Sequence, residues 1–179
     1  MSIARLAPLF VVVALVAAPV LAQAPPSPRE ADVASADGIV AALYDVISGP
    51  AGQARDWDRF RSLFAPGARL IPASPRRDGS APAALSPDDY VQRTSDSFMK
   101  NGFFEREIAR RTEAFGTVVH VFSTYESRRV RDDEKPMARG INSIQLMKHG
   151  GRWWIVTVMW DQERPDNPIP PQYLGGGGR

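Results

Sequence analysis

The C-terminal third of the chain has the clearest hydrophobic pattern. Two apolar-rich runs, residues 138–149 and 152–163, flank Gly150 and Gly151. Glycine at both central positions suits the tight turns that join antiparallel strands. The pattern therefore predicts a β-hairpin.

The register of this hairpin follows by counting outward from a two-residue turn. Asn142 is then opposite Met159 and Gly140 is opposite Asp161, and directly opposed residues share a face. Neither face of the hairpin is wholly polar, so we expect both to be covered, one by helices and the other by a partner sheet or subunit. The second strand divides into one face with Trp153, Ile155, Thr157, Met159 and Asp161 and another with Trp154, Val156, Val158 and Trp160.

The first hundred residues predict three helices. Apolar positions recur at helical spacing from residue 31 or 35 to residue 47, and a short second helix follows Asp56. The third helix is the best marked, because Ser86 is a suitable N-cap, Pro87 suits the first helical position, and Asn101-Gly102 ends it.

The remaining elements are predicted strands. A brief strand covers residues 68–71, and longer strands cover 103–111 and 112–128 before the hairpin. Three helices followed by about four long antiparallel strands is an α+β pattern, with the helices on one face of a bent sheet.

The N-terminus predicts export. Residues 1–22 are typical of a signal peptide, with an early Arg5 and an apolar run that is shorter than the roughly 20 residues of a membrane span. An uncleaved anchor is the alternative. Residues 23–30 are expected to form a disordered linker, 31–163 the domain and 164–179 an extended, flexible tail. The mature chain is expected in the periplasm or the medium.

The composition and motifs of the sequence exclude several classes of partner and cofactor. There is no cysteine, so export brings no disulfide and no lipid attachment, and we expect no membrane contact after cleavage. The net charge of +2 gives no concentrated basic surface for nucleic acid. Clustered histidines, GxSxG and a glycine-rich phosphate loop are all missing from the sequence, so no metal and no cofactor is predicted.

Three stretches give the chain a family resemblance: WDRFRSLFAPGARL, FGTVVHVFSTYESR and GINSIQLMKHGGRWWIVTVMWDQE. With them the chain resembles the nuclear transport factor 2-like superfamily, particularly its SnoaL-like and ketosteroid-isomerase-like members, over residues 31–163. The resemblance implies a curved antiparallel sheet wrapped around about three N-terminal helices, a cystatin-like cone with a deep pocket. It also implies that the W-x-I alternation of the last strand faces the helices, which leaves Trp154 and Trp160 on the convex face for a homodimer contact.

Asp161 is the first catalytic candidate. In the predicted register it lies across from Gly140, which leaves space above it, and one cross-strand step from Asn142. A carboxylate in a half-apolar pocket mouth can have a raised pKa and act as a general base. The alternative is that Asp161 meets solvent or pairs with an arginine.

His120 is the second catalytic candidate. Its neighbours in TVVHVFSTY are apolar on both sides of the strand, so His120 is at least partly buried whichever way it points. It is then either an acid or base near neutral pH or a hydrogen-bonded core residue.

Six further residues are candidates for binding a ligand, because they combine apolar surface with a polar tip or lie on the predicted concave face. They are Asn142, Tyr90, Trp57, Thr157, Met159 and Tyr125. For the aromatic ones, ordinary packing of helices on the sheet is the alternative.

The sequence thus predicts an exported protein that binds a small, apolar organic molecule. The alternative is a cofactor-free isomerase, cyclase or dehydratase that acts by general acid and base catalysis. Ketosteroid isomerases pair a catalytic Asp with a Tyr and a protonated Asp, and this trio has no placement in the sequence. The isomerase activity is therefore not transferred by the resemblance.

Overall fold

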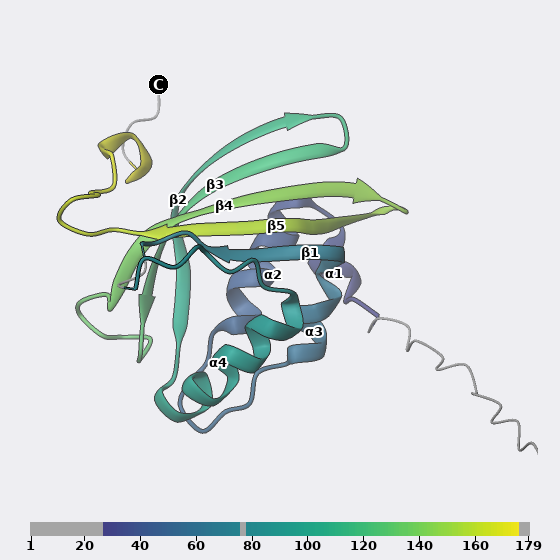
Figure 1. The fold of residues 1–179 in the computed structure, drawn as a ribbon. Helices are drawn as coiled ribbons and strands as arrows, with labels where there is room; N and C mark the ends of the chain where they lie inside the picture. The colour runs from purple at the N-terminus through teal and green to yellow at the C-terminus, as the bar shows by residue number, and fades with distance from the viewer. Residues whose placement is uncertain (1–26, 76–77, 176–179) are drawn as a thin grey trace, which may run out of the picture.

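The structure, a computed structural model, describes residues 27–75 and 78–175 (Figure 1). The predicted signal peptide, residues 1–22, lies outside the described residues, as does the first half of the predicted linker, residues 23–26. Over the described ranges, no helix is both long and apolar enough to span a membrane.

Four α-helices precede or interrupt the first strands, and polar caps start three of them. Ser35, Asp56 and Ser86 each accept a hydrogen bond from a backbone N–H in the first helical turn, which satisfies a donor that has no partner inside the helix. The predicted capping box at Ser86 and Asp89 is present. The helices are α1 (Glu30–Val33), α2 (Ala36–Ile47), α3 (Trp57–Ser62) and α4 (Pro87–Asn101).

Five strands form one mixed sheet in the order β1-β5-β4-β3-β2. Strands β2 to β5 are antiparallel neighbours as predicted, while β1 is longer than the predicted 68–71 and runs parallel to β5. The turn between β2 and β3 lies at Gly116-Thr117 instead of at the predicted break after Arg111. The strands are β1 (Phe64–Pro72), β2 (Phe104–Phe115), β3 (Val118–Arg128), β4 (Ala138–His149) and β5 (Arg152–Gln162).

The sheet curves, and the helices lie together on its concave side (Figure 1). The core forms where α2 and α3 pack against the concave side chains of the sheet. Its most buried members include Ile39, Phe60, Val121, Ile144, Leu146 and Ile155. The α+β cone expected from the sequence is therefore confirmed.

A β-bulge in the final hairpin changes the predicted register. Met147 pairs with Trp154 as predicted, but Leu146 pairs with Ile155 and Gln145 with Thr157, so Val156 is an extra residue in β5. A bulge of this kind reverses the alternation of side chains beyond it. Asn142 consequently pairs with Trp160, not with Met159.

The bulge corrects the predicted faces of β5. Val158 and Trp160 lie on the concave side, packed against the core, and Met159 lies on the convex side with 43% of its surface exposed. Thr157 and Asp161 lie on the convex side with Met159. Of the two tryptophans predicted for the dimer contact, Trp154 therefore lies on the convex face and Trp160 does not.

The C-terminal tail folds back over part of the convex face. Ile169 is buried, and the ring of Tyr173, in the 3-10 helix η1 (Pro171–Tyr173), meets that of Phe122 edge-on with 5.0 Å between centroids. Thr124 Oγ1 donates a hydrogen bond of 2.6 Å to the carbonyl oxygen of Tyr173. Residues up to η1 are thus held on the sheet.

Gly140 is a position where the sheet has no room for a side chain. A Cβ at this position would lie 2.3 Å from the carbonyl oxygen of Asp161 and 2.7 Å from the hydroxyl of Tyr125. We expect Gly140→Ala to lower the free energy of unfolding by about 1–3 kcal/mol through overpacking. Urea denaturation measures the change, and an unaltered midpoint would show that β4 can shift to make room.

Candidate functional site

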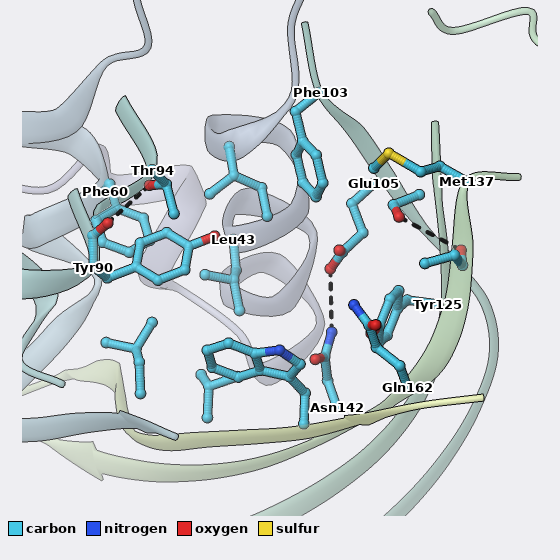
Figure 2. Close-up of a pocket in the computed structure, with 16 residues that line it drawn as sticks. Leu43, Phe60, Tyr90, Thr94, Phe103, Glu105, Tyr125, Met137, Asn142 and Gln162 are labelled. Carbon is cyan, nitrogen blue, oxygen red and sulfur yellow. Dashed lines mark hydrogen bonds between the residues drawn. The ribbon is translucent and has the colours of Figure 1, made fainter. Parts of the chain in front are cut away.

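A cavity of about 390 Å³ lies between the helices and the concave face of the sheet. Its walls are mainly apolar, with aromatic rings from Phe60, Tyr90, Phe103 and Trp160. One end is polar, and Glu105, Tyr125, Ser127, Asn142 and Gln162 gather there. In Figure 2, Glu105 and Asn142 point toward each other, Tyr125 and Gln162 lie beside them, and Tyr90 reaches in from the opposite wall.

The curvature of the sheet brings the polar residues together from four adjacent strands. Glu105 comes from β2, Tyr125 from β3, Asn142 from β4 and Gln162 from β5. Gly140 pairs with Tyr125 and leaves room for its hydroxyl. The predicted space above Gly140 is present, but Tyr125 fills it instead of Asp161.

Among the described residues that line this cavity, Glu105 is the only one with an acidic side chain. Among the described residues it has no ion-pair partner, and its carboxylate accepts one long hydrogen bond of 3.3 Å from Asn142 Nδ2. Burial raises the pKa of Glu105 to about 7, and the hydrogen bond from Asn142 opposes this rise only in part. The carboxyl group can therefore gain or lose a proton near neutral pH.

A hydrogen-bonded chain fixes the orientation of Asn142. Ser123 Oγ donates to the carboxylate of Glu107, so its oxygen is free to accept from the Tyr44 hydroxyl at 2.7 Å. The Tyr44 oxygen in turn accepts from Asn142 Nδ2 at 3.0 Å. Because a carboxylate anchors the chain and can only accept, the amide nitrogen of Asn142 must face Glu105.

Three phenols surround Glu105 and stay neutral at ordinary pH. Burial, followed by the nearby Glu105 carboxyl, raises the pKa of Tyr44, Tyr90 and Tyr125 above the usual range. Within the described part of the chain the Tyr90 hydroxyl has no hydrogen-bond partner, and it points into the cavity (Figure 2). It is available to donate a hydrogen bond to a bound molecule.

Asp161 lies on the other side of the sheet from this cavity. Its carboxylate accepts hydrogen bonds from Ser74 Oγ at 2.6 Å, Arg164 at 2.7 Å and Asn167 at 3.1 Å. Burial disfavours the charged form, but the bonds from Ser74 and Arg164 outweigh it and lower the pKa of Asp161. This geometry corresponds to the alternative in which Asp161 pairs with an arginine.

The other predicted residues divide between cavity, core and convex face. Tyr90, Tyr125 and Asn142 line the cavity. Trp57 packs in the aromatic core, stacked on Phe98 and edge-on to Phe60. Thr157, Met159 and His120 lie on the convex face, where His120 Nε2 hydrogen-bonds Ser143 Oγ at 3.0 Å.

Sequence reasoning missed Glu105, Trp160 and Gln162. In FFEREIARR, Glu105 lies among several arginines that could pair with it, but Arg110 pairs with Glu107 and Arg106 with Glu126. Strand alternation places Glu105 on the same face as Phe103, which was the available signal. Trp160 and Gln162 were missed because the sequence gives no sign of the bulge at Val156.

Across residues 27–75 and 78–175, no three His, Cys, Asp or Glu side chains lie close enough together to hold a metal ion.

The fold is shared with solved structures of low sequence similarity. A Nostoc punctiforme protein of unknown function with a cystatin-like fold is 14% identical, covers 74% of this chain and 90% of its own, and has a TM-score of 0.54. A Pseudomonas putida NTF2-like protein of unknown function is 11% identical over 70% of this chain and 82% of its own, with a TM-score of 0.52. A Kribbella flavida protein is 10% identical over 73% and 94%, with the same TM-score of 0.52. No protein-family profile and no curated protein sequence matches this chain. The chain therefore has the nuclear transport factor 2-like fold, also described as cystatin-like.

Proposed function

We propose that this protein binds a small, mostly apolar organic molecule in the cavity of the cone, with the Glu105 end recognising the polar group of that molecule. The observation that carries the proposal is an apolar cavity of ligand size with one carboxyl group that has no ion-pair partner among the described residues. Such a group costs free energy in the folded protein unless a bound molecule supplies the missing partner. The signal-like N-terminus supports export of the protein to the periplasm or the medium.

A second function, general base catalysis, is favoured by the pKa of Glu105. A carboxyl group with a pKa of about 7 is suited to proton transfer at physiological pH. The hydroxyls of Tyr90 and Tyr125 are placed to donate hydrogen bonds to a developing oxyanion. An isomerase, cyclase or dehydratase without a cofactor would use these groups, with Glu105 in the role that was predicted for Asp161 or His120.

Blocking the cavity tests the binding proposal. Ala138 lines the cavity, and its replacement by Trp would fill the space with an indole ring. We expect the wild type to bind the neutral fluorophore N-phenyl-1-naphthylamine with increased fluorescence, and Ala138→Trp to lose at least about 10-fold in affinity, since the ring has to be displaced.

The matched control is Ala114→Trp, which adds the same indole at an exposed position of β2. It should bind the probe as the wild type does. Equal binding by the two variants would place the probe outside the cavity, and no binding by the wild type would contradict the proposed function.

A further inference from the structure

The charge inside the cavity restricts the chemistry of its ligand. Glu105 is acidic, and no Lys, Arg or His is among the described residues that line the cavity. The nearby arginines are paired elsewhere: Arg106 and Arg128 contact Glu126, and Arg110 contacts Glu107. A ligand carboxylate or phosphate would meet a like charge and no cation, so the site disfavours anions.

The cavity lacks the partner that a buried carboxylate needs. An ionised carboxylate out of water requires an opposite charge or several hydrogen bonds. Asn142 donates one long hydrogen bond to Glu105, and the orientation of the Asn142 side chain is already fixed by its hydrogen bond to Tyr44. The missing partner is a cation with N–H donors.

The walls of the cavity are suited to bind a molecule that combines such a cation with an apolar body. A primary ammonium has three donors, and the carboxylate of Glu105 and the amide oxygen of Gln162 are acceptors at the same end of the cavity. The rings of Tyr90 and Trp160 add electron-rich faces that attract cations. We infer that the physiological ligand is a hydrophobic amine, an inference that rests on the proposed binding function. The ammonium group of this ligand pairs with Glu105, while its hydrocarbon body fills the aromatic end of the cavity.

This inference predicts that binding is coupled to proton release. At pH 6, below the pKa of about 7, Glu105 is mostly neutral, and an incoming ammonium would ionise it. Glu105 also adjoins a second pocket with charged side chains, of which Arg106 and Arg128 pair with Glu126 and Asp45 pairs with Arg59. The other charged groups there are Arg131, which lies over the ring of Phe104, and Asp132. The groups that face Glu105 on the side of the ligand cavity are neutral in this range, because burial raises the pKa of the phenols and the amides do not titrate. They are Tyr44 on α2, Tyr90 on α4, Tyr125 on β3, Asn142 on β4 and Gln162 on β5.

A matched series of alicyclic probes tests the inference. 1-Adamantanemethylamine, 1-adamantanemethanol and 1-adamantanecarboxylate have the same hydrocarbon cage and differ in the polar group. In calorimetric titrations at pH 8 we expect the amine to bind wild-type protein about 10- to 100-fold more tightly than the alcohol, the value of a charge-assisted hydrogen bond, and the carboxylate to bind most weakly.

Glu105→Gln should remove the preference for the amine while it leaves the affinity for the alcohol within about threefold, since it keeps the shape of the side chain and removes its charge. Glu113→Gln, at an exposed position of β2, is the matched control and should behave as the wild type. Titration of the amine at pH 6 in two buffers with different heats of ionisation should show release of close to one proton by the wild type and none by Glu105→Gln.

The outcomes separate this inference from the proposed function. If the alcohol binds and the amine binds no better, the amine inference is wrong and the binding function stands. A preference that survives in Glu105→Gln would likewise overturn it, because the cation would then be held elsewhere. If none of the three probes binds and N-phenyl-1-naphthylamine also fails, both proposals are wrong.

Discussion

Replacing Phe60 with alanine should lower the free energy of unfolding by about 3–5 kcal/mol, the range for loss of a buried aromatic ring. Phe60 has no exposed surface and lies at the centre of an aromatic cluster. Its ring centroid is 4.8 Å from that of Phe64, 5.3 Å from Tyr90 and 5.6 Å from Trp57. The substitution removes these contacts from α3, β1 and α4 together. Since a domain is typically stable by only about 5–15 kcal/mol, the loss would be a large share of the total.

The control is Phe115→Ala, which removes the same ring from a position that is 89% exposed at the β2–β3 turn. It should change stability by less than about 0.5 kcal/mol. Chemical denaturation, followed by tryptophan fluorescence, measures both variants. Equal effects would mean that the aromatic cluster does not hold the helices on the sheet.

Helices α2, α3 and α4 and the antiparallel succession of β2 to β5 could be predicted, because local signals specify them. The capping box at Ser86, the N-cap at Asp56 and the Gly150-Gly151 turn each act within a few residues, and each is present in the structure. The direction of β1 could not be predicted, because it depends on a pairing with β5 that is distant in the sequence. The turn at Gly116 was missed because β2 and β3 form one long run of strand-favouring residues.

The candidate site was predicted only where it did not depend on the register of β5. Tyr90, Tyr125 and Asn142 were identified and lie at the cavity. One extra residue, Val156, moves every later side chain of β5 to the other face of the sheet. Trp160 and Gln162 therefore lie on the concave face, where Met159 and Asp161 had been predicted. Glu105 was missed for a different reason: charge pairing among Glu105, Glu107 and the arginines of β2 is a matter of geometry that the sequence leaves open.

The half-buried Glu105 should also make stability depend on pH. Its pKa is about 7 in the folded protein and near the ordinary value of 4.5 in the unfolded chain. Between these two values the folded state keeps a proton that the unfolded state has lost, so stability falls as pH rises from 4.5 to 7. The total loss is up to about 3 kcal/mol, from the difference between the two pKa values.

Glu105→Gln isolates this contribution, since glutamine has no proton to lose. Relative to the wild type, the variant should be nearly unchanged at pH 4.5 and more stable by up to about 3 kcal/mol at pH 8, measured by urea denaturation at a series of pH values. Carboxyl groups with lowered pKa, such as Asp32 and Glu126, lose their contribution at lower pH and do so equally in both proteins. Glu113→Gln should give a curve parallel to the wild type. A constant difference between Glu105→Gln and the wild type would show that water in the cavity solvates the carboxylate and that Glu105 needs no cationic partner.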